Sequence, residues 1–218
     1  MTPRVSFDRL ARPYRLLEYL AFGRDLERAR FTHLPRLRDC RSILVLGEGD
    51  GRCLERLVTA APAARVDCLD LSPAMLDRAA ARLAGRAAAT RVSFRQADLL
   101  AVDLPAAHYD AVVTCFFLDC FTATQAEAVM TRIRGSLRPG ALWLWADFAV
   151  PPAGPARWRA QLWLALLYAF FRQATGLPVR ELPPVEPLLA AAGWEPVAEL
   201  SLQHGLVRSA VFREAPGR

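Results

Sequence analysis

The chain has 218 residues, of which 53% are hydrophobic and 23% are charged, and its formal net charge is +6. This length and apolar content predict one domain with a substantial core and exclude a disordered chain. The positive charge comes from arginine alone, and the arginines are scattered along the chain. We therefore expect a solvated basic surface and no nucleic-acid partner.

The five cysteines and three histidines show no metal-ligand spacing. The cysteines are odd in number and include no C-x-x-C pair, which indicates neither a zinc site nor a disulfide framework. The first residues lack the apolar region of a signal peptide, and no run of roughly eighteen uncharged apolar residues occurs. A cytoplasmic protein without a metal ion is the expectation.

Short apolar runs alternate with helical patterns, which is typical of a parallel sheet covered on both faces. The predicted strands are residues 42–46, 65–69, 91–95, 110–115, 141–146, 195–201 and 206–213. Helices are predicted at 52–61, 73–83, 124–137 and 183–192. Only the short segment 202–205, which includes Gln203, His204 and Gly205, separates the last two strands, so these should form an antiparallel hairpin. The expected fold class is α/β, a doubly wound, seven-stranded, mostly parallel Rossmann-like sheet with helices on both faces.

The first predicted strand runs into three alternating glycines, Gly47, Gly49 and Gly51. Glycine lets the backbone approach a ligand closely, and Asp70, at the end of the second apolar run, is placed to chelate a ribose diol. The glycine spacing is one residue shorter than the turn that cradles a dinucleotide pyrophosphate, and no P-loop lysine follows. The pattern favours a nucleoside ligand without phosphates.

Together with the terminal hairpin, these residues resemble the class I S-adenosylmethionine-dependent methyltransferases, over residues 7–212. The resemblance implies S-adenosylmethionine as cofactor: the glycine loop wraps its methionine part, Asp70 holds the ribose hydroxyls and Asp98 reaches the adenine amino group. Glu48 and Asp50, inside the loop, either take polar roles near the methionine ammonium or are exposed turn residues. The further cofactor-binding positions expected are Leu71, Met75, Ala97, Leu99 and Cys115.

The segments outside this core are similar to those of the menaquinone and ubiquinone C-methyltransferases. Residues 7–14 and 22–23 resemble their amino-terminal lid, and residues 137–148 and 202–207 resemble their fifth strand and terminal hairpin. We expect a helical lid at residues 1–38 on a methyltransferase domain at 39–218. The arginine–asparagine pair that those enzymes usually carry after the fourth strand is missing, which leaves the acceptor open.

If residues 158–171 form a helix, this helix is apolar on nearly all of its circumference. Three interpretations remain: core packing against the sheet, the wall of an apolar acceptor pocket, or transient contact with a membrane surface. The expected partner is a lipophilic or aromatic small molecule, and the expected assembly is a monomer or homodimer.

Methyl acceptors with a hydroxyl, an activated carbon or a protonated amine must lose a proton. Asp119, Asp147 and His204 follow the fourth, fifth and sixth strands, and so should lie at the carboxyl edge where ligands bind. Tyr14 would close over the site from the lid. Each of the first three also fits a structural role, as a helix or turn cap or a surface hairpin residue. These four residues are the candidates for catalysis, and none is singled out as the base.

The function expected is methyl transfer to oxygen or carbon of an apolar or aromatic small molecule. Two alternatives stay open. One is a methyltransferase that acts on protein or nucleic acid, although no appended recognition domain or basic patch is visible. The other is a non-catalytic protein that keeps the fold and binds the cofactor or a partner.

Overall fold

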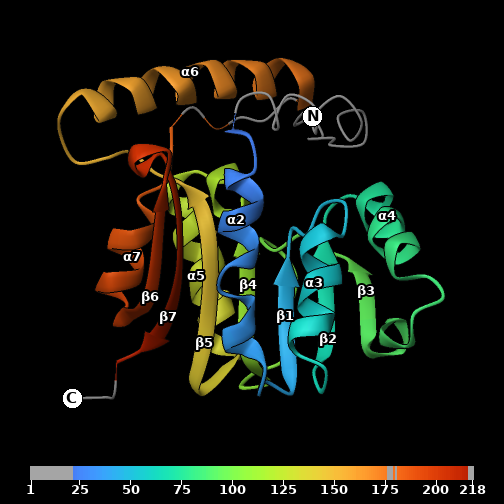
Figure 1. Cartoon of the computed structure of the whole chain (residues 1–218). Coiled ribbons are helices and arrows are strands. Elements are labelled where there is room, and N and C mark those ends of the chain that lie inside the picture. Colours follow the sequence, from blue (N-terminus) through green and yellow to red (C-terminus); the bar gives the residue numbers. More distant parts are fainter. Residues whose placement is uncertain (1–21, 176–178, 180, 216–218) are drawn as a thin grey trace.

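The seven strands form a single sheet in the order β3-β2-β1-β4-β5-β7-β6 (Figure 1). The structure is a computed structural model that describes residues 22–175, 179 and 181–215. The strands β1 to β5 run parallel, and β7 lies antiparallel between β5 and β6. Their bounds are β1 (Ser42–Leu46), β2 (Arg65–Asp70), β3 (Val92–Gln96), β4 (Tyr109–Cys115), β5 (Leu137–Phe148), β6 (Trp194–Leu202) and β7 (Val207–Glu214). The predicted fold class, including the terminal hairpin, is confirmed.

Helices cover both faces of this sheet. Their bounds are α2 (Asp25–Phe31), α3 (Arg52–Ala60), α4 (Pro73–Leu83), α5 (Ala123–Ser136), α6 (Pro155–Thr175) and α7 (Val185–Ala191). In Figure 1, α2 and α3 lie in front of the sheet and α5 and α7 lie behind it. Successive residues of β1 serve the two faces in turn: Ile43 and Val45 pack with α3, while Leu44 and Leu46 pack on the side of α5. This alternation follows from the period of two along a strand.

The fifth strand is the main departure from the prediction. We predicted residues 141–146, and the strand extends from Leu137 to Phe148. Pro139 and Gly140 indicate a turn because proline has no N–H to donate and Gly140 has a φ of 79°. Leu137 nevertheless pairs with Tyr109 across an irregularity in the β4–β5 register. The strand therefore begins before the turn signal, and α5 ends at Ser136.

A third apolar cluster lies at the carboxyl edge of the sheet. The inner face of α6 contributes Ala160, Leu164 and Tyr168, which pack with side chains of α2, β5 and β7. Figure 1 shows α6 lying across this edge, above the ends of the strands. Residues 22–38 of the predicted lid pack into the same clusters as the sheet, whereas residues 1–21, including Tyr14, lie outside the described residues.

Neither a membrane-crossing helix nor a metal-binding cluster of histidine, cysteine or acidic residues occurs within the described part of the chain. The five cysteines are free.

Candidate functional site

The glycine loop follows β1 and leads into α3. Gly47, Gly49 and Gly51 all have positive φ angles, of 64°, 68° and 85°, which glycine adopts at no steric cost. A Cβ on Gly51 would lie 2.6 Å from the Cα of Ala79 on α4. A Cβ on Gly49 would meet nothing within 4 Å. Gly51 therefore lets two helices approach closely, while Gly49 leaves open space in front of the loop.

Asp70 ends β2 beside this loop. Its Oδ1 accepts a hydrogen bond from the backbone N–H of Ser72 at 2.9 Å, and its Oδ2 accepts one from the backbone N–H of Gly49 at 3.3 Å. Ser72 caps α4 by accepting a hydrogen bond from the backbone N–H of Met75. The carboxylate thus lies between the carboxyl ends of β1 and β2, where the sequence predicted it and where open α/β sheets bind ligands.

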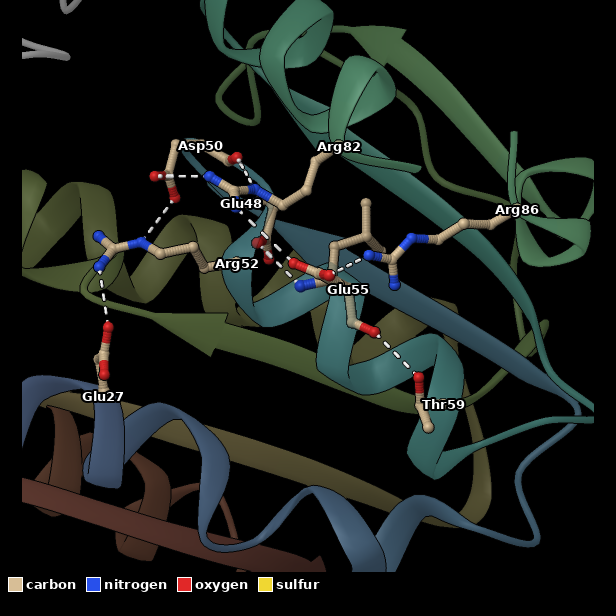
Figure 2. Close-up of polar contacts among 9 residues, drawn as sticks. Glu27, Glu48, Asp50, Arg52, Glu55, Thr59, Arg82 and Arg86 are labelled. Atoms are coloured by element: carbon tan, nitrogen blue, oxygen red, sulfur yellow. Dashed lines mark hydrogen bonds and ion pairs between the residues drawn. The ribbon is translucent and has the colours of Figure 1, made fainter. Parts of the chain in front are cut away.

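An ion-pair network fixes the outer side of the loop (Figure 2). Asp50 pairs with Arg52 at 3.0 Å and with Arg82 of α4 at 3.3 Å. Arg52 also reaches Glu27 of α2 at 3.3 Å, and Arg82 reaches Glu55 of α3 at 3.7 Å. Each partly exposed pair contributes little alone, but together the pairs join α2, α3 and α4 to the loop. Asp50 therefore has a structural role here, and its contact with a ligand stays a prediction.

Glu48 turns inward from the same loop. Its Oε1 accepts a hydrogen bond from the backbone N–H of Leu54, in the first turn of α3, at 2.9 Å. The pKa of Glu48 is raised to about 8, mainly by burial and also by the nearby charge of Asp50. The Leu54 N–H and the Arg30 guanidinium lower this pKa and so partly offset the rise. Glu48 is thus a carboxyl group that carries a proton near neutral pH and would lose it beside a cationic ligand.

The end of β3 completes this corner. The backbone N–H of Ala97 donates to the Asp70 carbonyl at 3.0 Å, and the Asp98 carboxylate accepts a hydrogen bond from the Leu100 N–H at 2.9 Å while remaining exposed. Leu71 is also exposed, at the tip of β2. The side chain of Leu99 is buried in the core on the α5 face, and the role of this residue in cofactor binding stays a prediction. Only its backbone remains for a ligand.

A second group of polar side chains lies across the ends of β4 and β5, and we call Asp119, Cys120, Asp147 and Tyr168 the acid cluster. Asp147 Oδ2 accepts a hydrogen bond from the Asp119 backbone N–H at 3.3 Å. The Cys120 thiol donates to Asp119 Oδ1 at 3.4 Å, and the Tyr168 hydroxyl donates to the Asp119 carbonyl at 3.1 Å. The two predicted acids, 28 residues apart in sequence, therefore lie together.

The carboxyl groups of the acid cluster share their environment and influence each other. Burial raises the pKa of Asp119 to about 6, although hydrogen bonds from Cys120 and Asp147 and the charge of Arg30 favour its anion. Burial also raises the pKa of Asp147, and the neighbouring Asp119 charge raises it further. Because the Asp119 charge raises the pKa of Asp147 while a hydrogen bond from Asp147 favours the Asp119 anion, the protonated form is favoured more strongly at Asp147 than at Asp119. Of the two acids, Asp119 is therefore the one that ionises more readily.

Aromatic rings gather at the same edge of the sheet, and Phe22, Phe116, Phe148 and Trp163 are called the aromatic cluster below. The ring of Phe148 lies 5.2 Å from that of Phe116 and 5.6 Å from that of Phe22, which lies 5.9 Å from Trp163. The guanidinium of Arg30 lies 4.6 Å from the Phe116 ring centre. Phe116 has a φ of 53°, which is uncommon for a bulky residue. Backbone angles of this kind are found mostly at functional sites.

His204 lies at the same edge but in a different hollow. It has left-handed backbone angles in the turn between β6 and β7 and is exposed. With Glu186, Ser201, Arg208 and the β5–α6 connection it lines a cavity of about 310 Å³. The structure therefore places His204 at the predicted edge without bringing it into the acid cluster.

Three residues of the site were not predicted from the sequence. Arg30 is one of many arginines, and no motif distinguishes it. Phe116 and Tyr168 stand within segments that the sequence analysis identified, but an apolar run does not reveal which ring faces a site. The short polar break at 119 within an aromatic stretch is the one signal that pointed here.

Comparisons with known proteins agree with this geometry. A family described as a methyltransferase domain matches residues 43–140, from β1 through the start of β5. A demethylmenaquinone methyltransferase of Thermus thermophilus is 34% identical over 150 residues, which span 68% of this chain and 66% of that protein. Both matches identify the chain as similar to methyltransferases.

Solved structures of two O-methyltransferases share the fold. The mitomycin 7-O-methyltransferase MmcR matches with a TM-score of 0.66 and 20% identity over 88% of this chain and 55% of its own. An O-methyltransferase family protein of Burkholderia thailandensis matches with a TM-score of 0.69 and 19% identity over 97% of this chain and 58% of its own. The chain thus spans somewhat more than half of these two proteins and just under two thirds of the Thermus relative.

Proposed function

We propose that the protein is an S-adenosylmethionine-dependent methyltransferase whose acceptor is an apolar or aromatic small molecule, methylated on oxygen or carbon. The observation that carries the proposal is the meeting of two sites at one edge of the sheet. Asp70 is tied to the glycine loop at the ends of β1 and β2, and the acid cluster lies across the neighbouring ends of β4 and β5. Phe117 joins them, since its ring lies against Gly47.

The residues of the first site fit the proposed cofactor. Asp70 would accept hydrogen bonds from the ribose hydroxyls, Gly49 leaves room for the chain of the methionine part, and the acidic Glu48 suits its ammonium group. When bound, S-adenosylmethionine supplies an activated methyl group on a sulfonium. The protein's task is then to hold the acceptor in line with that methyl group.

The second site supports proton removal. As the acceptor atom bonds to the methyl carbon, the carbon–sulfur bond breaks and its electron pair stays on sulfur. An acceptor hydroxyl or carbon acid must also release a proton, and Asp119, the more readily ionised of the two acids, is the group assigned to take it. The aromatic cluster would position a flat acceptor and keep water away from Asp119.

Calorimetric titration of the full chain with S-adenosylmethionine and S-adenosylhomocysteine tests the cofactor assignment, with NAD as the control ligand. Asp70→Ala should weaken binding of the first two by roughly 1–3 kcal/mol, because a charged hydrogen-bond partner is lost. Asp77→Ala, which removes an exposed carboxylate from α4, is the matched control and should bind like the unchanged protein. Equal affinities for all three proteins would overturn the role of Asp70.

The acceptor class is tested by screening phenols and hydroquinones with labelled S-adenosylmethionine. Quinone precursors come first because the Thermus relative is a demethylmenaquinone methyltransferase. Trp163→Ala should raise the KM for an aromatic acceptor several-fold, through lost ring contact with the aromatic cluster, and should leave cofactor affinity unchanged. Gln161→Ala, at an exposed position of the same helix, is the control. Cofactor binding without turnover of any small acceptor would favour a non-catalytic role or a macromolecular substrate.

A further inference from the structure

The outer face of α6 is apolar and exposed, although the inner face is buried. The inner face packs through Ala160, Leu164 and Tyr168, spaced four residues apart. Large apolar residues also recur every four residues on the opposite side, where Trp158, Leu162 and Leu166 are 77%, 63% and 58% exposed. We call these three the outer stripe. Core packing therefore explains the inner face of α6 but not its outer face.

The charges on α6 are of one sign. The helix contains Arg157, Arg159 and Arg172 and no acidic residue, and the three arginines are exposed. By helical spacing, Arg159 flanks the outer stripe on one side and Arg172 flanks it on the other. An exposed Trp–Leu stripe bordered by arginines matches helices that lie in the interface of an anionic bilayer with the apolar face toward the acyl chains.

We propose that the outer stripe of α6 docks the protein on an anionic lipid surface. The helix lies parallel to the carboxyl edge of the sheet (Figure 1), so docking would place the acid and aromatic clusters beneath the membrane interface. Tyr168, on the inner face of the same helix, contacts Asp119. An acceptor dissolved in the bilayer would thus enter the site past a helix already resting on the lipid.

The surface is distinct from the protein's other exposed apolar residues. Val197 on β6 is 43% exposed and Val150, after β5, is 39% exposed, but neither is part of a stripe of large residues. Only a contiguous apolar patch buries enough area to hold a protein at an interface, and single exposed side chains are normal. Charge complements this area, because each arginine near an anionic surface adds to the attraction.

Flotation of the full chain with vesicles tests the inference without any methyl transfer, so its failure is separate from failure of the proposed function. The probes are vesicles of phosphatidylcholine alone and of phosphatidylcholine mixed with phosphatidylglycerol. We expect binding to the mixed vesicles that weakens as salt is raised. The double variant Trp158→Ser, Leu166→Ser should bind at least about tenfold more weakly, since it removes two large apolar groups from the contact. Val197→Ser is the matched control and should bind normally.

Two further measurements keep the result decisive. Circular dichroism melting should give the same Tm for the double variant and the control, because both changed α6 residues are exposed. Sedimentation without lipid should find the same oligomeric state for both. The proposal is overturned if the protein fails to float with anionic vesicles, if the double variant floats equally well, or if the variant changes only self-association, in which case the outer stripe is an interface between copies.

Discussion

The two halves of the site are built in different ways. The proposed cofactor half, at the ends of β1, β2 and β3, is held by backbone hydrogen bonds and partly exposed ion pairs within the segment from β1 to α4. The acceptor half, at the ends of β4 and β5, brings together α2, α6 and the loop after β4, and it buries acids among rings. The first half therefore depends on one stretch of the chain from β1 to β3, whereas the second depends on how α2 and α6 pack against the sheet.

The largest effect expected concerns the chemistry of the acceptor half. Asp119→Asn should lower the rate of methyl transfer by roughly 10²- to 10⁴-fold, because the base is lost, while S-adenosylmethionine affinity stays the same. In the unchanged protein, activity should rise as the pH passes about 6, where Asp119 loses its proton, and the variant should lack this rise. Rates measured across pH with one acceptor check both points.

Asp147→Asn is the matched control for that prediction. Burial and the neighbouring Asp119 charge raise the pKa of Asp147 well above its ordinary value and so favour its neutral form. The neutral amide is then a close substitute, and the rate should fall by less than about tenfold, within the range of a lost neutral hydrogen bond. If both variants lose activity equally, the two acids act as a structural unit and Asp119 is not the base.

A smaller effect is expected from the scaffold of the cofactor half. Gly51→Ala should lower the free energy of unfolding by roughly 2–4 kcal/mol, because a Cβ there is both strained at positive φ and pressed against the Ala79 backbone. Gly49→Ala meets only open space, so its cost should be roughly 1–2 kcal/mol. Urea unfolding measures both. Equal losses would mean that packing between α3 and α4 is not what requires Gly51.

The smallest effect expected is the release of a proton from Glu48 when the cofactor binds. Glu48 has a pKa of about 8, so it is protonated at pH 7, and an ammonium group bound beside it should release up to about one proton. The binding enthalpy of S-adenosylmethionine should then differ between phosphate and Tris buffers, whose ionisation enthalpies differ. Glu48→Gln should abolish the difference. The same enthalpy in both buffers for the unchanged protein would place the ammonium elsewhere.

The sequence predicts the position of a residue where a local pattern determines the structure around it. Alternating glycines and an acid after the next strand placed Asp70 against the loop, since both are fixed by two adjacent parallel strands. It also placed Asp119 and Asp147 at one edge, because carboxyl ends of parallel strands meet there. It could not show that they touch, because their contact depends on how the 118–120 turn folds back onto β5.

The predictions that went beyond strand order were weaker. Leu99 follows β3 as expected, but its side chain turns into the core, and an apolar residue in a loop fits either environment. His204 shares the edge but belongs to another hollow, since β7 and β6 lie beyond β5 and set it apart. The apolar composition of α6 does not by itself distinguish one buried face from two apolar faces.

The ion pairs from Asp50 through Arg52 to Glu27 have a consequence for the order in which two ligands bind. They tie the glycine loop to α2, the helix that carries Arg30 beside Phe116. A ligand that makes the loop more rigid would also restrain α2 through these ion pairs, and thermodynamic reciprocity then requires that a ligand that restrains α2 also restrains the loop. Because exposed pairs of this kind contribute about 0–1 kcal/mol each, the coupling is weak. Under the proposed function, binding of S-adenosylmethionine at the glycine loop would therefore slightly favour binding of the acceptor at the ends of β4 and β5, without imposing a strict order.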